Sequence, residues 1–369
     1  MEDITFGFIG FGLIGGSIAR ALKENQPNNK IIAYNYYKNR ANANLIEALS
    51  DHTIDSISTE LSDGFEKCDI IFLCAPVLDN IMYIKELKSI IKATCIITDV
   101  GSVKGNIDSA IHEMELEANF IGGHPMAGSE RTGYSHSSSK LLENAFYILS
   151  PTEKTPASMT DIMYQLVLTI GAIPILLDCK QHDDLTAAIS HVPHIIAASL
   201  VNMVKSQDDE ADLMKSLAAG GFKDITRIAS SSPVVWQNIC LTNTDSILHF
   251  LSLYKNTLDE LIFAIEQKDD KRIYDIFESA KDFRDSIPNK SIGMIEKVFE
   301  VYLDIADEAG TIATIATILA SNAISIKNIG IIHNREFQEG VLRIELYDET
   351  STSKTIALLE EYHYTIYKR

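Results

Sequence analysis

The first half of the chain alternates short apolar runs with segments of helical periodicity. The apolar runs fall at residues 4–9, 30–34, 69–74, 94–99, 145–149 and 172–177, and helical spacing falls at 17–23, 76–91 and 157–170. Apolar runs separated by helices are typical of parallel strands that are buried on both faces. The pattern therefore predicts an α/β domain with a doubly wound sheet over residues 1–178.

After residue 178 the pattern changes to long helical segments with few helix-breaking residues. These segments are expected at 183–203, 208–219, 222–230 and 233–267. A largely apolar helical region beside an α/β domain commonly forms one wall of a ligand site and an interface between subunits. We therefore expect an all-α domain over residues 179–295 that contributes to substrate binding and to a homodimer.

The last part of the chain has a third pattern. Its order is strand 302–306, helix 311–321, strands 324–332 and 340–347, helix 353–361 and strand 362–367. This strand-helix-strand-strand-helix-strand order is that of a ferredoxin-like domain. Residues 296–369 are therefore predicted to form a separate domain, and a regulatory or dimerising role is expected for it.

Composition narrows the classes of function. The chain has 369 residues, 46% hydrophobic content, a net charge of −19 and a pI near 4.9. This acidity argues against nucleic acid or an anionic membrane as a partner, and it makes any cluster of Lys and Arg informative. No apolar stretch approaches the length of a membrane span, and no signal peptide is expected. The five cysteines have neither paired nor metal-binding spacing, so we expect reduced thiols in a cytoplasmic protein.

A glycine-rich turn follows the first apolar run. Gly10, Gly12 and Gly15 form a G-x-G-x-x-G motif, with Leu13 and Ile14 between the last two glycines, and a helix is predicted directly after it. Such glycines allow a tight turn and close approach of the backbone to a pyrophosphate, whose charge is met by the helix N-terminus. The motif in this context predicts a Rossmann-type dinucleotide-binding domain.

Position 35 bears on which dinucleotide is bound. An Asp or Glu commonly binds the ribose 2′-hydroxyl of NAD about 20 residues beyond the glycine motif. Here Asn35 ends the second strand, and Lys38 and Arg40 follow it. An acid would repel the 2′-phosphate of NADP, whereas an amide does not. NAD is the expected cofactor, and NADP stays open.

Three segments follow the carboxyl ends of predicted strands or apolar runs. They are Ala75-Pro76, Gly101-Ser102 and the stretch that contains His124. Because ligands bind outside the carboxyl ends of strands in doubly wound sheets, these segments can converge on one crevice. An N-cap of a helix is the alternative for Ser102.

The stretch around His124 reads Gly122-Gly123-His124-Pro125-Met126-Ala127-Gly128-Ser129-Glu130. Proline disfavours helix at the preceding residue, so His124 is expected in a fixed, non-helical loop. The flanking glycines let the backbone approach another group closely. A surface turn with an incidental histidine is the alternative, but the neighbouring motifs favour a functional one.

The segment Ser190-His191-Val192-Pro193-His194 interrupts a predicted helix. Ser190 and His194 are four residues apart and share a face, and Pro193 forces a kink that can free backbone groups. A buried structural histidine is an equally good interpretation of this segment taken alone. The single tryptophan, Trp236, either belongs to the core or lines the pocket.

Two cations share a face of the next helix. Lys223 and Arg227 are four residues apart, in a helix expected to begin after Gly220 and Gly221. Like charges at this spacing repel each other, so an acidic protein that keeps them is expected to place an anion there. The alternative is a solvated helix face paired with acidic residues.

Taken together, these motifs resemble the prephenate dehydrogenase family with an appended ACT domain, and the resemblance covers essentially the whole chain. It rests on Gly10-x-Gly12-x-x-Gly15 and on four segments that occur in the family's order and spacing, 99–104, 123–130, 190–194 and 221–227. The Asp307-x-x-Gly310 turn followed by a helix is similar to ACT domains, which bind amino acids.

The resemblance implies roles for individual residues. His124 matches the histidine that accepts the proton of the substrate's ring hydroxyl, and Ser102 the serine that hydrogen-bonds both. Arg227 matches the arginine that pairs with a substrate carboxylate, and Lys223 a cation near the substrate side chain. The remaining substrate-site residues are Ser190, His194, Gly220 and Glu130; the cofactor-site residues are Gly10, Gly12, Leu13, Ile14, Gly15, Asn35, Ala75, Pro76, Gly101 and Ser102.

The reaction implied is oxidative decarboxylation of prephenate to 4-hydroxyphenylpyruvate in tyrosine biosynthesis, with tyrosine as the expected effector. The substrate gives hydride to nicotinamide, its hydroxyl loses a proton and carbon dioxide leaves, so no metal is needed. Three alternatives remain open: an arogenate dehydrogenase, a hydroxyacid dehydrogenase that shares the nucleotide domain, and a non-catalytic amino-acid sensor on a dehydrogenase scaffold. A hydroxyacid dehydrogenase leaves the 190–194 segment and the ACT-like end unexplained.

Overall fold

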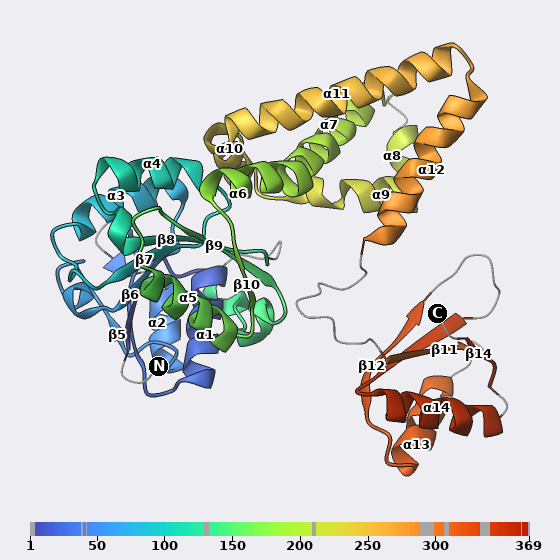
Figure 1. Ribbon diagram of the computed structural model, residues 1–369, viewed down its shortest axis with the longest axis horizontal. Helices are drawn as coiled ribbons and strands as arrows, with labels where there is room; N and C mark the ends of the chain where they lie inside the picture. The colour runs from blue at the N-terminus through green and yellow to red at the C-terminus, as the bar shows by residue number, and fades with distance from the viewer. Residues whose placement is uncertain are drawn as a thin grey trace. The chain divides into compact units, whose positions relative to one another are not determined.

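The computed structural model describes residues 4–37, 40–41, 43–128, 133–208, 212–287, 299–305, 310–332, 340–362 and 364–367. The chain divides into two compact units, Met1–Gly293 and Met294–Arg369 (Figure 1).

An eight-stranded sheet forms the centre of the first half of the chain. Its strands lie in the order β10-β9-β8-β7-β6-β1-β2-β5, and every neighbouring pair is parallel except β8 and β9. The strands are β1 (Thr5–Ile9), β2 (Lys30–Tyr34), β5 (Ser56–Ile57), β6 (Ile70–Leu73), β7 (Ile96–Asp99), β8 (Phe120–Pro125), β9 (Phe146–Pro151) and β10 (Ile173–Leu176). The run from β5 to β8 has the Rossmann order, and the predicted dinucleotide-binding fold is confirmed.

Helices cover both faces of this sheet, as predicted. The core on one face joins α1 (Leu13–Asn25), α2 (Ala43–Ser50) and α5 (Ala157–Thr169) to the strands; the core on the other joins α3 (Val77–Leu87) and α4 (Gly105–Glu113) (Figure 1). The short strands β3 (Tyr36–Tyr37) and β4 (Arg40–Ala41) form a separate two-stranded pair. The 3₁₀ turns are η1 (Phe65–Lys67), η2 (Glu117–Asn119), η3 (Tyr134–His136) and η4 (Ser139–Leu142).

One prediction about the sheet was wrong. The residues before Pro125 were expected to form a loop, but His124 lies inside β8, whose partner β9 runs antiparallel to it. The backbone is extended, as the proline requires, and the ladder to β9 then fixes it further.

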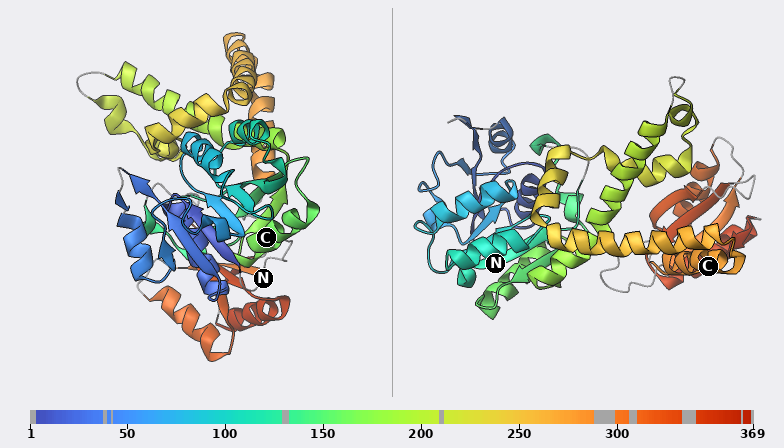
Figure 2. Two further views of the ribbon diagram at one scale, coloured as in Figure 1. Left: turned by 90° about the vertical axis from the view of Figure 1, so that its left-hand side faces the viewer. Right: turned by 90° about the horizontal axis from the view of Figure 1, so that it is seen from above.

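The rest of the first unit is helical. It consists of α6 (Cys179–Thr186), a π-helical turn η5 (Ala187–His191), α7 (Val192–Gln207), α8 (Leu213–Leu217), α9 (Gly220–Thr226), the 3₁₀ turn η6 (Arg227–Ser230), α10 (Pro233–Thr242), α11 (Thr244–Glu266) and α12 (Asp270–Ser286). Helices α7 and α11 are neighbours (Figures 1 and 2). The single helix expected over 233–267 is two helices that meet at Asn243, and α9 begins at Gly220, ahead of the predicted position.

The helical run from Cys179 to Gln207, which consists of α6, η5 and α7, is 29 residues long and has a mean hydropathy of 1.4 in its most apolar window. By length and composition alone it could cross a membrane, so the expectation that no stretch approaches this length was wrong. Its first turns carry His182 and Asp183, which are buried against the loop that follows β7. We therefore interpret it as the helix that joins the sheet to the helical region.

The second unit has the predicted element order. Its elements are β11 (Phe299–Ile305), α13 (Thr311–Ser321), β12 (Ile326–Ile332), β13 (Gly340–Leu346), α14 (Glu349–Glu361) and β14 (Ile366–Tyr367). The strands pair in the order β12-β13-β11-β14, all antiparallel. Alternate residues of β11 are buried against α13 and α14 in one apolar core, as period-2 alternation requires.

Candidate active site

The glycine motif forms an open turn at the carboxyl end of β1. Gly10 has a φ of +83°, and a Cβ there would lie 2.6 Å from the backbone nitrogen of Ala75, so only glycine fits. A Cβ on Gly15 would likewise lie close to the backbone, 3.1 Å from the Gly10 carbonyl oxygen. The turn lies between β2 and β6, where the strand order reverses and where Ala75 and Pro76 follow β6. The predicted cofactor residues therefore share one edge of the sheet.

The start of α1 has room for an anion. Helix α1 begins at Leu13 with Gly12 as its N-cap, and no side chain of the described residues caps its first amides. A Cβ on Gly12 would meet no atom of the described chain within 4 Å. Open space in front of uncapped helix amides suits a pyrophosphate.

Two glycine variants should separate folding from cofactor binding. Gly12→Ala is expected to weaken NAD binding by at least ~10-fold, about 1.4 kcal/mol, because its methyl group enters the space left for the ligand. Its unfolding free energy should stay within ~0.5 kcal/mol of the parent, since the methyl group meets no protein atom. Gly10→Ala is the control, which should instead lower stability by ~1–3 kcal/mol. NAD titration and urea unfolding measure both; equal NAD affinity in Gly12→Ala and the parent would contradict this site.

Asn35 lies at the same edge of the sheet. It follows β2, whose last residue, Tyr34, accepts a hydrogen bond from the Gly10 amide at 2.9 Å. A residue that the sequence did not single out, Asn44 of α2, donates to the Phe11 carbonyl at 2.9 Å and so supports the glycine turn. Lys38 lies outside the described residues.

A buried ion pair joins β7 to β8. Lys104 Nζ donates to Asp99 Oδ2 and, at 2.7 Å, to the carbonyl oxygen of Gly123, and both charged side chains are fully buried. Asp99 also accepts from the amides of Gly101 (2.9 Å) and Gly123 (3.0 Å). A Cβ on Gly123 would lie 2.5 Å from the Asp99 carbonyl oxygen, and one on Gly122 3.0 Å from Lys104 Cδ. The two glycines before His124 are therefore required by close packing on this ion pair.

His124 is the first of three side chains joined by hydrogen bonds. Its Nδ1 lies 2.8 Å from Nε2 of His182, and Nδ1 of His182 lies 2.8 Å from Oδ1 of Asp183. The Asp183 carboxylate also accepts from the amides of Lys104 and Gly105, both at 2.8 Å. The start of α6 is thereby fixed to the start of α4, beside the histidine of β8.

The surroundings of His124 keep its ring neutral. Burial lowers the pKa of His124 well below its ordinary value of 6.5, and the positive potential of His182, Lys104 and His191 lowers it further. A neutral imidazole can accept a proton at neutral pH. The chemistry available at the end of β8 is therefore that of a general base.

Ser102 lies in the segment between β7 and α4, but its expected contacts are not those seen. Neither His124 nor any other described residue makes a hydrogen bond with it, and the Nδ1 of His124 is bonded to His182 instead. Lys104 is the N-cap of α4, although its side chain does not bond the first amides of that helix, so the N-cap interpretation of Ser102 was wrong.

A second group of aromatic side chains lies in the helical region. Asn243 donates both to the Asp183 carbonyl oxygen (2.9 Å) and to Nδ1 of His191 (3.2 Å). The His191 and His194 rings both contact Trp236, edge-on with centroids 6.0 Å apart and stacked at 3.9 Å respectively. Contacts therefore link the His124 group to the predicted substrate residue His194.

The Ser190–His194 pair has a defined local geometry. The helix departs from regular α-helical geometry in the π-helical turn, which ends just before Val192, and Pro193 lies in the first turn of α7. Nδ1 of His194 donates to the Ser190 carbonyl oxygen at 2.9 Å. The other ring nitrogen of a neutral His194 is then an acceptor. π-Helical turns are frequent at functional sites.

The two predicted cations lie on elements that pack against α7, the helix that carries His194. Lys223 is on α9 and Arg227 begins η6, and both side chains are exposed. Gly220 is the first residue of α9. Glu130 lies outside the described residues.

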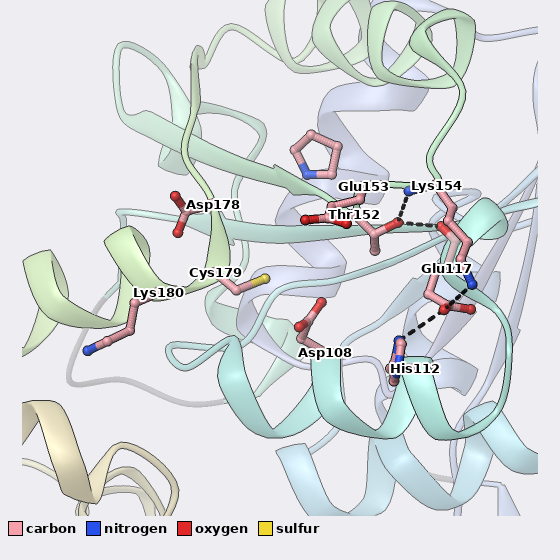
Figure 3. A pocket seen from close by; sticks show the side chains of 10 residues that line it. Asp108, His112, Glu117, Thr152, Glu153, Lys154, Asp178, Cys179 and Lys180 are labelled. Carbon is pink, nitrogen blue, oxygen red and sulfur yellow. Dashed lines mark hydrogen bonds and ion pairs between the residues drawn. The ribbon is translucent and has the colours of Figure 1, made fainter.

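A cavity of about 410 Å³ lies elsewhere in the first unit (Figure 3). Its lining comes from α4, from η2, from the end of β9 with the residues after it, and from the start of α6 with the residue before it. None of the predicted site residues lines it. Cys179 belongs to this lining, and burial raises the pKa of its thiol to about 12, so the thiol is protonated at neutral pH. All five cysteines are free.

Comparison with known proteins adds to this geometry. The family description "Prephenate dehydrogenase, nucleotide-binding domain" matches residues 18–176, and "Prephenate dehydrogenase, dimerization domain" matches residues 178–279. A prephenate dehydrogenase of Bacillus subtilis (strain 168) is 38% identical over 362 residues, which are 98% of this chain and 96% of the relative.

Two solved structures are similar to more than three quarters of this chain. Prephenate dehydrogenase from Aquifex aeolicus in complex with hydroxyphenyl propionate and NAD+ has a TM-score of 0.73 and 27% identity, and the match covers 78% of this chain and 99% of that one. Arogenate dehydrogenase from Synechocystis has a TM-score of 0.69 and 28% identity, with 77% and 100% covered. The chain has a Rossmann sheet, a neutral histidine near the carboxyl end of β8 and matches along nearly its whole length. This protein therefore belongs to the prephenate dehydrogenase family of oxidoreductases.

Proposed function

We propose that this protein catalyses the NAD-dependent oxidative decarboxylation of prephenate to 4-hydroxyphenylpyruvate. The observation that carries the proposal is the neutral His124, on the same sheet edge as the glycine turn that suits a dinucleotide. Membership of the family and the Aquifex aeolicus structure with NAD+ support the choice of substrate and cofactor.

The chain's own residues have two tasks in this reaction. Bound NAD would supply the hydride acceptor, held by Gly10, Gly12 and the start of α1. His124 accepts the proton of the substrate hydroxyl group as the hydride leaves the carbon that bears this group. A positioned base of this kind contributes ~10²–10⁴-fold to the rate. Because loss of carbon dioxide makes the ring aromatic, alignment of the departing groups is the main requirement.

Arg227 is proposed to bind a carboxylate of prephenate. Arg227→Ala is expected to raise KM for prephenate ~10–100-fold, since a charge-assisted hydrogen bond is worth ~1.5–3 kcal/mol, and to leave KM for NAD nearly unchanged. Arg227→Lys should recover part of the loss, because lysine keeps the charge but loses the bidentate geometry. The control is Arg272→Ala on α12, which removes an exposed arginine that pairs with Glu260. Equal effects of Arg227→Ala on both substrates would remove the carboxylate assignment.

The substrate side chain separates prephenate from arogenate, which carries an amine in place of the keto group. Lys223, proposed to lie near this side chain, favours the doubly anionic prephenate over arogenate with its ammonium group. The deciding assay follows the absorbance of reduced nicotinamide with each substrate and with NAD or NADP. We expect the highest kcat/KM with prephenate and NAD, and no turnover with either substrate would refute the proposed function.

The helical region is proposed to form a homodimer of a cytoplasmic enzyme. Large apolar side chains are exposed on its outer helices, among them Leu241, Phe263, Phe277 and Phe283. Exposed large apolar side chains mark an interface between proteins where they form one patch. The match to a dimerization domain over residues 178–279 agrees with this.

The second unit, proposed to span residues 296–369, is proposed to be an ACT domain that binds tyrosine. Its βαββαβ order and its antiparallel β12-β13-β11-β14 sheet support this. A variant that ends at residue 293, the boundary between the two compact units, is expected to keep activity and to lose tyrosine inhibition. Inhibition curves of both forms at equal prephenate measure this. Inhibition that persists in the shortened chain would place the tyrosine site in the first unit.

A further inference from the structure

The side chain of Asp183 faces only hydrogen-bond donors among the described residues, and this arrangement favours its carboxylate form. Oδ1 accepts from the Lys104 amide and from the His182 ring, and Oδ2 accepts from the Gly105 amide. These amides stand at the start of α4, where the helix dipole favours a negative charge. Asp183 is 6% exposed and His182 is fully buried, so water does not compete for these bonds.

The direction of every proton in the group follows from that carboxylate. A carboxylate only accepts, so the proton between Asp183 and His182 belongs to Nδ1 of His182. In a neutral imidazole the other nitrogen is then an acceptor, so Nε2 of His182 accepts from Nδ1 of His124. The lone pair of a neutral His124 is therefore on Nε2, away from His182. A ring in the opposite tautomer could not accept a proton there.

We propose that His182 and Asp183 are positioning residues that set the tautomer of His124 and relay the proton it receives. The inference rests on the proposed function of His124 as the base. When Nε2 of His124 takes the hydroxyl proton, the Nδ1–H bond of His124 breaks and the same proton bonds to Nε2 of His182. The positive charge then lies on His182, whose Nδ1–H group donates to Asp183, and His124 is again neutral.

The groups that face His124 favour this transfer. Lys104 and His191 act on His124 from the segment before α4 and from η5, and both oppose a positive charge on its ring. Lys104 is itself paired with Asp99, whereas His182 has the Asp183 carboxylate in direct contact. His182 and Asp183 can therefore affect the rate without touching the substrate.

Three variants separate orientation from relay. In His182→Gln, the amide oxygen can still accept from Nδ1 of His124 but the side chain cannot take up a proton, so kcat should fall ~10-fold while the tautomer is kept. In His182→Phe both roles are lost, and kcat should fall ~10²-fold or more, within the range for a general base. In Asp183→Asn the amide nitrogen can donate to Nδ1 of His182. This would reverse the direction of both hydrogen bonds, from His182 to Asp183 and from His124 to His182, so kcat should fall at least as far as in His182→Phe. In each variant, KM for prephenate and the Kd of NAD should stay within about threefold of the parent. A fall in kcat without a matching change in KM, together with a changed pH profile of kcat, is an effect that a merely structural role would not produce.

A spectroscopic measurement tests the inference independently of activity. Nitrogen-15 NMR of the folded parent chain, with His124→Asn and His182→Gln used for assignment, should show Nδ1 of His124 protonated and Nε2 unprotonated at neutral pH. The control is His112→Gln, which changes an exposed histidine of α4 and should keep parental kcat. A His124 protonated at Nε2, or an unchanged kcat in both His182 variants, would overturn the inference. If the chain turned over no prephenate the proposed function would fail, yet the NMR result would still decide the tautomer.

Discussion

Replacement of His124 by asparagine is expected to lower kcat by ~10²–10⁴-fold, the largest effect of any single change at the site. Asparagine keeps a polar, hydrogen-bonding group on β8, but its amide cannot accept a proton at neutral pH. The Kd of NAD should stay near that of the parent, because the glycine turn and α1 are untouched. Steady-state kinetics and NAD titration measure the two quantities.

The pH dependence gives the same prediction a second readout. Because burial lowers the pKa of His124 below 6.5, the base is present through neutral pH, and kcat/KM of the parent should fall only below pH 6.5 as His124 takes up a proton. His124→Asn should lack this fall. The control is His136→Asn on η3, whose exposed side chain lies outside the hydrogen-bonded group. Near-normal kcat in His124→Asn would exclude this residue as the base.

Removal of the buried cation should have the largest effect on stability. Lys104→Met is expected to lower the free energy of unfolding by ~3–5 kcal/mol, because the Asp99 carboxylate is then left as a buried charge that, among the described residues, accepts only from two backbone amides. The Gly123 carbonyl loses a donor at the same time. Urea unfolding, followed by circular dichroism, measures the change.

Two further variants test the cause of that loss. The double variant Asp99→Asn with Lys104→Met removes both charges and should recover part of the stability, since a neutral pair carries no unpaired charge. Lys180→Met breaks an ion pair with Asp184 that is 73% exposed on the lysine side, and should cost no more than ~1 kcal/mol. If Lys104→Met were as mild as Lys180→Met, the buried pair would not be a main source of stability.

The sequence was sufficient for elements whose residues carry the pattern themselves. The strands at 30–34 and 69–74, the glycine turn and the whole order of the second unit follow from local apolar periodicity and turn chemistry, and they are confirmed. Strand β5 was not predicted because its two residues are too few for a period, and the break at Asn243 because no proline or glycine marks it.

The His124 stretch was found for its glycines and proline, but its nearest partners were not. His182 is 58 residues away from His124 along the chain. Lys104 belongs to the segment 99–104, in which the sequence singled out Ser102 and not the lysine. No periodicity signals that an imidazole on one helix faces an imidazole on a strand, because that contact depends on how α6 packs on α4. The one local signal was the start of α6, where Asp178 and Gln181 form a capping box just ahead of His182.

The junction between the sheet and the helical region has a consequence for how the enzyme works. Val103 packs with Ala187, Ile239 and Ile247, Asp183 holds the start of α4, and Asn243 holds both Asp183 and His191. A hinge at this point would have to break all of these contacts together, so we expect the two halves of the site to move together. We therefore expect substrate selectivity to depend on the shape of the site as it is folded, and not on closure of the helical region over the sheet.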